Sequence, residues 1–226
     1  MIKKLQKLKA KKGFTLVELI VVIAIIGVLA AILIPTMLGF VTSSRVTSAN
    51  TTAAEIQKQI NNFLTDADTA GYGMKKSNSA QANFTFKVDG DGAWSTTLAR
   101  GAYAPGSAED SAFKGSSTMA WADSTTGDVK ANEGNKSDIT DATTLMTRTL
   151  ADVFPDLKGA YVYAYCEAGS CKYVAYSADG NEKPGSMPTE DDFENGVYEW
   201  DGNTAGITSD GIILGTAPEL KLGKAS

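Results

Sequence analysis

The chain has 226 residues, 43% of them hydrophobic, and a formal net charge of −5 with no histidine. Because histidine is the commonest general base and a frequent metal ligand, its absence disfavours most hydrolases and zinc sites. No P-loop, dinucleotide fingerprint or nucleophile elbow occurs in the sequence. We therefore expect a protein that is not an enzyme and that needs no cofactor or metal.

Positive charge is concentrated at the amino terminus. Residues 1–13 contain six lysines and no acidic residue, so their removal takes the side-chain net charge from −5 to −11. A basic stretch beside an apolar run stays on the cytoplasmic side of a membrane. The acidic remainder disfavours a general nucleic-acid-binding surface, and no specific nucleic acid is predicted as a partner.

An apolar run follows the lysines. Residues 19–34 are all Leu, Ile, Val, Ala or Gly, and the 21 residues from 14 to 34 span about 31 Å as a helix, enough to cross a hydrocarbon core. Glu18 stands just inside this run, where a charge costs about 2.5–3.5 kcal/mol and requires a partner. If the peptide bond after Gly13 is cut, the Phe14 amine becomes free, and a neighbouring copy shifted along its axis could bring this amine to Glu18.

The segment KGFTLVEL at residues 12–19, followed by the apolar run, resembles the amino terminus of type IV pilins and their pseudopilin relatives. The resemblance covers about residues 1–64. It implies cleavage between Gly13 and Phe14 by a prepilin peptidase, N-methylation of Phe14, and polymerisation of many copies through a long helix. Glu18 selects the register in such a polymer, and an assembly ATPase and a platform protein are the further partners that the resemblance implies.

Two simpler interpretations compete with this one, a secretory signal peptide and a plain membrane anchor. A signal peptide ends its apolar region with a small-residue cleavage site, and residues 33–38 form a poor one. A plain anchor has no need of the carboxylate of Glu18.

The helical pattern continues past the apolar run. Pro35 lacks a backbone donor, and with Gly27 and Gly39 nearby this is the weakest part of the helix. Gly27 and Pro35 are the expected bend, since many helices of the resembling family bend at this proline. Apolar residues then recur at steps of three or four, which predicts a stripe that holds a globular head: Val46, Ala49, Ala53, Ile56, Ile60 and Phe63.

The predicted helix runs from residue 14 to about residue 64. Polar residues lie off its stripe: Asn50, Glu55, Gln57, Lys58 and Asn61. A second helix is predicted over residues 137–154, capped by Asp138 or Thr140 and ended by Pro155.

The patterns that predict strands are weaker than the helix patterns and extend over fewer residues. Residues 83–88 alternate like a strand before the turn signal at Asp89 and Gly90, inside a region up to about residue 137 that otherwise reads as irregular. Two further strands are predicted at residues 196–200 and 211–214.

The clearest strand signal is a hairpin over residues 161–176. Folding it about residues 168–169 places Cys166 opposite Cys171, and opposed residues of a non-hydrogen-bonded pair lie about 4.5 Å apart at Cα, within disulfide range. We predict a disulfide formed outside the cytoplasm, the alternative being two buried thiols. The same register puts four residues on one face: Val162, Ala164, Tyr173 and Ala175.

An antiparallel sheet packed on the helix stripe gives a head of the α+β class, which is also the architecture that the pilin resemblance implies. Three segments are expected. They are a cleaved leader at 1–13, the hydrophobic transmembrane or filament-core half of the long helix at 14–41, and a globular head at 42–226 that includes the second half of that helix.

Acidic turns and scattered tryptophans are two further features of the sequence. Oxygen-rich turns at residues 89–91, 179–182 and 201–203 match no EF-hand loop, so no metal site is predicted. Trp94, Trp121 and Trp200 have the ring faces that an adhesin uses for sugars, but scattered tryptophans are more often core or interface residues.

The sequence therefore predicts the major subunit of a type IV pilus filament, a homo-polymer. The subunit is held in the cell membrane by a single span and lies on the cell surface after assembly. Three alternatives stay open. The chain is a pseudopilin of a type II secretion or DNA-uptake machine, a minor pilin acting as a tip adhesin, or an anchored enzyme, which the absence of histidine disfavours.

Overall fold

The computed structural model of the chain describes residues 14–77, 80–100, 112–114, 119–125, 127–178, 187–188, 190–198, 206–207 and 212–222. The chain divides into two compact units, Met1–Ser43 and Ser44–Ser226, and each is described by itself. One helix, α1 (Leu16–Thr69), contributes residues to both units. It begins two residues after the predicted start and ends five residues after the predicted end.

The second unit is built on a five-stranded antiparallel sheet with the strand order β2-β1-β3-β4-β6. The strands are β1 (Gln81–Val88), β2 (Trp94–Arg100), β3 (Ala160–Glu167), β4 (Ser170–Ser177) and β6 (Leu214–Ala217). Beside it lies a parallel pair, β5 (Val197–Tyr198) and β7 (Lys221–Leu222). The remaining elements are the 3-10 turn η1 (Lys136–Asp138) and the helices α2 (Ala142–Val153) and α3 (Glu190–Asn195). The predicted α+β class is confirmed.

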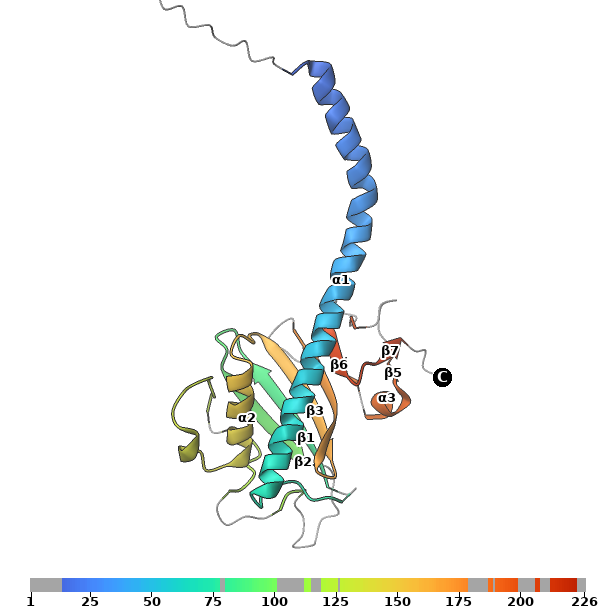
Figure 1. Cartoon of the computed structure of the whole chain (residues 1–226). Coiled ribbons are helices and arrows are strands. Elements are labelled where there is room, and N and C mark those ends of the chain that lie inside the picture. The colour runs from blue at the N-terminus through green and yellow to red at the C-terminus, as the bar shows by residue number, and fades with distance from the viewer. Residues whose placement is uncertain are drawn as a thin grey trace, which may run out of the picture. The chain divides into compact units, whose positions relative to one another are not determined.

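The second part of α1 and helix α2 pack on one face of the sheet and share a core with it (Figure 1). The predicted stripe on α1 is confirmed, because its members from Ala49 to Phe63 are buried and Val46 packs against them. Side chains of a strand alternate between faces, and the sheet meets the stripe with alternate residues: Ala82, Phe84, Phe86, Val88, Val162 and Ala164. Burial of this stripe packs the second part of α1 against the sheet of the head.

The opposite face of the sheet carries a smaller apolar cluster. It consists of five buried residues: Ala175, Phe193, Tyr198, Leu214 and Leu220. Tyr173 of β4 lies between two stacked rings, with centroid distances of 5.6 Å to Tyr165 and 4.7 Å to Phe193. The elements α3, β5 and β7 therefore belong to the second unit through apolar contacts.

Strand β2 lies in the region that the sequence predicted to be irregular. The turn signal before it is confirmed, since Asp89 accepts hydrogen bonds from the backbone N–H of Asp91 and Ala93 at 2.9 and 2.8 Å. Val88 then pairs with Trp94 to start the antiparallel ladder. The outer edge of β2 is bonded in turn by Val129, whose N–H and carbonyl both pair with Trp94 at 2.8 Å.

The second helix starts later than predicted. Its cap is Asp141, whose carboxylate accepts from the Thr144 N–H at 2.7 Å, and neither Asp138 nor Thr140 has this role. Asp138 ends the turn η1 instead. A carboxylate three residues before a free N–H is the geometry that stabilises a helix start.

The hairpin β3–β4 is confirmed, and Cys166 lies opposite Cys171 as predicted. The predicted register is wrong beyond that pair. Tyr165 pairs with Tyr173, so Lys172 is one extra residue on β4, which is a β-bulge.

The bulge exchanges the faces of β4, because a shift of one residue moves every side chain to the other side of the sheet. Val174 and Tyr176 therefore face the core under α1. Tyr173 and Ala175, which the sequence placed there, lie in the opposite cluster.

Side-chain amides of α1 bond the backbone at the bulge. Asn61 accepts from the Cys171 N–H at 2.8 Å and donates to the Cys171 carbonyl at 3.2 Å. Gln57 donates to the Lys172 carbonyl at 2.7 Å. Strand β6 pairs with β4 only at residues 174–177, so α1 supplies at 171–172 the partners that a strand otherwise provides. The amides lie off the apolar stripe, as predicted, and they are bound to the sheet.

Asn61→Ala is expected to lower the free energy of unfolding by about 1–3 kcal/mol, because it leaves the backbone N–H of Cys171 without its partner in a part-buried site. Asn62→Ala is the matched control, since Asn62 is exposed and its one hydrogen bond within the described residues is to Gln59, at 3.5 Å. Denaturant unfolding of the full chain in detergent, followed by tryptophan fluorescence, compares the two. Equal midpoints for both variants would show that the amide clamp does not stabilise the head.

Candidate functional site: the amino-terminal helix

The first unit exposes its apolar side chains. Every large apolar side chain whose burial is described between residues 14 and 41 is exposed, with fractions from 45% at Val41 to 86% at Phe14. Within the described residues α1 is the one helix long and apolar enough to cross a membrane. An apolar surface of this length requires a covering of lipid or of other protein.

Glu18 is held by Thr15 at the start of α1. The Glu18 Oε2 atom accepts from the Thr15 N–H and from the Thr15 hydroxyl, both at 2.8 Å. The Glu18 N–H donates to the Thr15 Oγ1 atom at 3.2 Å, and the Leu19 N–H donates to the Thr15 carbonyl at 3.2 Å. This reciprocal arrangement is a capping box, in which threonine caps the helix and glutamate returns to the threonine N–H.

The capping box uses one oxygen of the carboxylate. In the described part of the chain, the Glu18 Oε1 atom makes no hydrogen bond. Our sequence reasoning assigned Glu18 a partner in another copy and missed Thr15. The signal was present, because a threonine three residues before a glutamate and an apolar run is the spacing of a capping box.

The structure describes some of the other predicted site residues of this segment. Gly13 and the leader at 1–13 lie outside the described residues, and Phe14 is exposed just before α1. Gly27 and Pro35 lie inside α1, which continues as helix through the proline. The Thr36 hydroxyl donates to the Leu33 carbonyl at 2.9 Å beside this proline. The bend at Gly27 and Pro35 stays a prediction.

Comparison with known proteins locates the similarity in this same segment. A family model described as the prokaryotic N-terminal methylation motif matches residues 8–34. In this segment the chain is similar to type IV fimbrial proteins.

Curated fimbrial proteins are similar to this chain over its amino-terminal third. The type IV major fimbrial protein FimA of Dichelobacter nodosus is 37% identical over 78 residues, which cover 33% of this chain and 50% of the relative. A fimbrial protein of Pseudomonas aeruginosa is 46% identical over 72 residues, or 27% and 47% of the two chains. A probable minor fimbrial protein of Dichelobacter nodosus is 42% identical over 62 residues, or 27% and 39%. The chain thus spans about half or less of the length of these relatives, and no solved structure matches it at a significant level.

The head holds the cysteine pair on its central hairpin, β3–β4. The backbone N–H and carbonyl of Cys171 bond to Asn61 of α1, so they are not directed at Cys166. The two residues are therefore a non-hydrogen-bonded pair, the kind whose Cα atoms approach most closely. Both cysteines are buried and carry free thiols in this structure. Burial raises the pKa of the Cys166 thiol, and the neighbouring Cys171 raises it further.

The cysteines are expected to be oxidised in the exported protein, since they close a short loop of adjacent strands. Reducing the disulfide is expected to lower the stability of the head by about 2 kcal/mol, because a closed loop restricts the unfolded chain. Alkylation of denatured, non-reduced protein followed by mass spectrometry measures the thiols. Two alkylated cysteines in freshly isolated protein would contradict the disulfide.

A raised pKa disfavours the thiolate that attacks in thiol exchange, so the reduced pair is expected to oxidise slowly without a catalyst.

The tryptophans and acidic turns take no part in a surface site that the structure describes. Trp94 and Trp121 are buried in the core, and Trp121 stacks on Phe113 with a centroid distance of 4.1 Å. Trp200 and the turns at 179–182 and 201–203 lie outside the described residues. Within the described residues no group of three or more His, Cys, Asp or Glu side chains is placed to hold a metal ion.

Proposed function

We propose that this chain is the major structural subunit of a type IV pilus filament. The observation that carries the proposal is the contrast along α1. Its first part exposes all of its described large apolar side chains, while its second part buries an apolar stripe against the head. Such a helix suits a subunit that is stored in lipid and then packs its first part against the same part of other copies.

Glu18 selects the register between copies in this proposal. Thr15 occupies the Oε2 atom, and the Oε1 atom stays available for the Phe14 amine of a neighbouring subunit. The pair forms in a low-dielectric filament core, where an uncompensated charge is costly. The capping box supports this role, because it fixes the carboxylate at the end of the helix before assembly.

Assembly requires the partners that the family implies. A prepilin peptidase cleaves after Gly13, and Phe14 is methylated. Transfer of an apolar helix from lipid to a bundle of similar helices gains little from the hydrophobic effect, since lipid is equally apolar. An assembly ATPase acting through a platform protein supplies the work of extraction, and the filament is displayed at the cell surface.

Two alternative functions are compatible with the same amino-terminal segment. A pseudopilin forms a short filament in a secretion or DNA-uptake machine, and a minor pilin acts at the tip as an adhesin. A relative named as a minor fimbrial protein gives the second alternative specific support. The abundance of the chain in the filament distinguishes a major pilin from these two alternatives, because a major pilin forms most of the filament mass.

Intact-mass analysis of the filament protein tests the processing step. We expect a chain that starts at Phe14 and carries one added methyl group. A filament protein that retains residues 1–13 would refute the proposal, whereas a cleaved but unmethylated chain would refute the methylation alone.

A further inference from the structure

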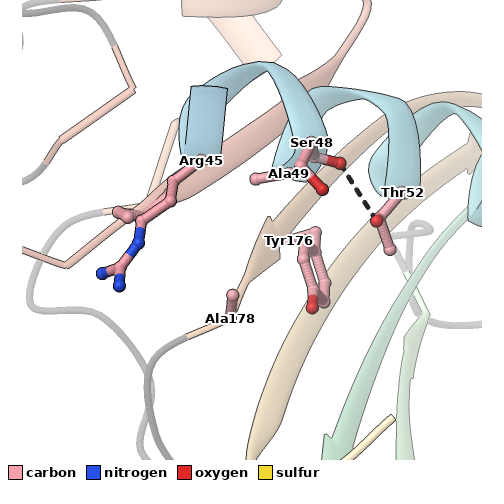
Figure 2. A pocket seen from close by; sticks show the side chains of 7 residues that line it. Arg45, Ser48, Ala49, Thr52, Tyr176 and Ala178 are labelled. Atoms are coloured by element: carbon pink, nitrogen blue, oxygen red, sulfur yellow. Dashed lines mark hydrogen bonds between the residues drawn. The ribbon is translucent and has the colours of Figure 1, made fainter. Parts of the chain in front are cut away.

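A pocket of about 300 Å³ lies in the second unit, where α1 crosses the end of β4. Figure 2 shows Arg45, Ser48 and Thr52 along α1, with Tyr176 of β4 below them. Among the described residues that line this pocket, Arg45 is the one that carries a charge. Two other pockets of similar size contain acidic lining residues, Glu55 and Asp156 in one and Glu219 in the other. Of the three pockets, the Arg45 pocket is thus the one whose described lining residues include a positive charge and no negative charge.

Hydrogen-bond donors in the pocket are available. Across the described residues, the exposed guanidinium of Arg45 has no hydrogen bond or ion pair, and the hydroxyl of Ser48 has no hydrogen-bond partner. The Thr52 hydroxyl donates to the Ser48 carbonyl at 3.1 Å, as the dashed line in Figure 2 marks. The free donors match an anion with several oxygen acceptors, because a planar guanidinium binds phosphate or carboxylate with two parallel hydrogen bonds.

The position of Arg45 in the sequence indicates which anion it meets. No charged residue occurs from 19 to 44, and Arg45 is four residues after Val41, the last residue of the apolar segment. When residues 14–41 cross a bilayer, the next residues lie at the headgroup layer, where arginine side chains reach the lipid phosphates. Residues 14–226 carry a net charge of −11, so a negative membrane surface repels the chain as a whole and a local cation provides attraction.

We infer that the Arg45 pocket binds the phosphodiester of a phospholipid headgroup and holds the head on the membrane before assembly. Arg45 donates to the phosphate oxygens and Ser48 adds a hydroxyl donor, while Tyr176 forms the wall below them. The inference rests on the membrane-held stage of the proposed function. It assigns to the head a lipid site that is separate from the apolar helix.

Photocrosslinking of the full chain in phosphatidylethanolamine vesicles tests the inference. The vesicles contain a minor fraction of phosphatidylglycerol with a photoreactive headgroup, and mass spectrometry maps the lipid-modified peptides. We expect modification of the residues that line the pocket, reduced about tenfold by Arg45→Gln, since the variant loses a charge-assisted hydrogen bond. Lys58→Gln is the matched control, because Lys58 is an exposed cation of α1 that does not line the pocket. It should keep wild-type modification.

Each of the following results would contradict the inference in a different way. Resistance to alkaline extraction, measured on the same vesicles, reports insertion. A chain that does not insert would refute the membrane-held stage and this inference together. An inserted chain with equal modification of wild type and Arg45→Gln would refute the lipid site alone. Loss of the modification on adding excess inorganic phosphate would identify free phosphate as the ligand. If Arg45→Gln reduced filament yield with lipid modification unchanged, Arg45 would instead contact a second copy of the chain.

Discussion

Cells whose only copy of this chain carries Glu18→Gln should insert the subunit in the membrane and form few or no filaments. Removing the charge makes insertion easier, because a carboxylate in the apolar segment is costly. The incoming Phe14 amine, however, then finds no carboxylate, and an unpaired charge in an apolar core costs about 3–5 kcal/mol. Shearing the cells and comparing released filament with membrane-held subunit measures the effect, and we expect filament yield to fall by at least about tenfold.

The capping box decides how this experiment is designed. Glutamine can replace glutamate in a capping box, so Glu18→Gln removes the charge and keeps the bonds to Thr15. Thr15→Val is the complementary control. It removes the hydroxyl that bonds Glu18 at 2.8 Å, costs about 1 kcal/mol of helix stability, and leaves the charge in place. Filament loss in Thr15→Val with normal yield in Glu18→Gln would assign Glu18 to helix capping and contradict its role in the register.

The second large effect is expected at Gly215 of β6, where a strand meets the backbone of α1. A Cβ atom added there would lie 2.1 Å from the Ala49 carbonyl oxygen and 2.7 Å from the Asn50 nitrogen. Neither backbone atom can move without displacing the helix. The neighbouring Thr216 N–H donates to Asn50 at 2.9 Å, so displacement also breaks this hydrogen bond. Gly215→Ala should lower the free energy of unfolding by about 3 kcal/mol, a large part of the stability of a typical domain.

Gly39→Ala provides the control for this substitution. An added Cβ at Gly39 meets no atom within 4 Å, and alanine favours the helix by about 1 kcal/mol or less. Denaturant unfolding of the full chain in detergent, followed through the buried Trp94 and Trp121, compares the variants. A Gly215→Ala chain that unfolds at the wild-type midpoint would show that α1 and β6 do not approach so closely.

The long helix α1 was predictable because its signals are local. The apolar run, Gly13, Phe14 and Glu18 form one short motif, and the stripe from Val46 to Phe63 follows helical periodicity over several turns. The α+β class followed from the stripe and the β3–β4 hairpin. The filament contacts proposed for Glu18 would involve other copies, so neither the sequence nor the single chain contains their geometry.

The features that the sequence did not reveal depend on tertiary contacts. Strand β2 includes the polar run Ser95–Thr97, which has no alternation of the kind that marks a half-buried strand. The bulge at Lys172 exists because amides of α1 bond the neighbouring backbone, and no local pattern in β4 encodes it. The start of α2 was mispredicted because Asp138 and Thr140 are also favourable cap residues, whereas Asp141 accepts the capping hydrogen bond from Thr144.

The most direct test of the central claim is the composition of native filaments. Filaments sheared from cells that express the chain are imaged by electron microscopy, and their protein is identified and quantified by mass spectrometry. A major pilin predicts long surface filaments in which this chain, beginning at Phe14, forms most of the protein mass. Filaments of normal number and length that lack the chain, or that contain it only as a trace component, would contradict the claim.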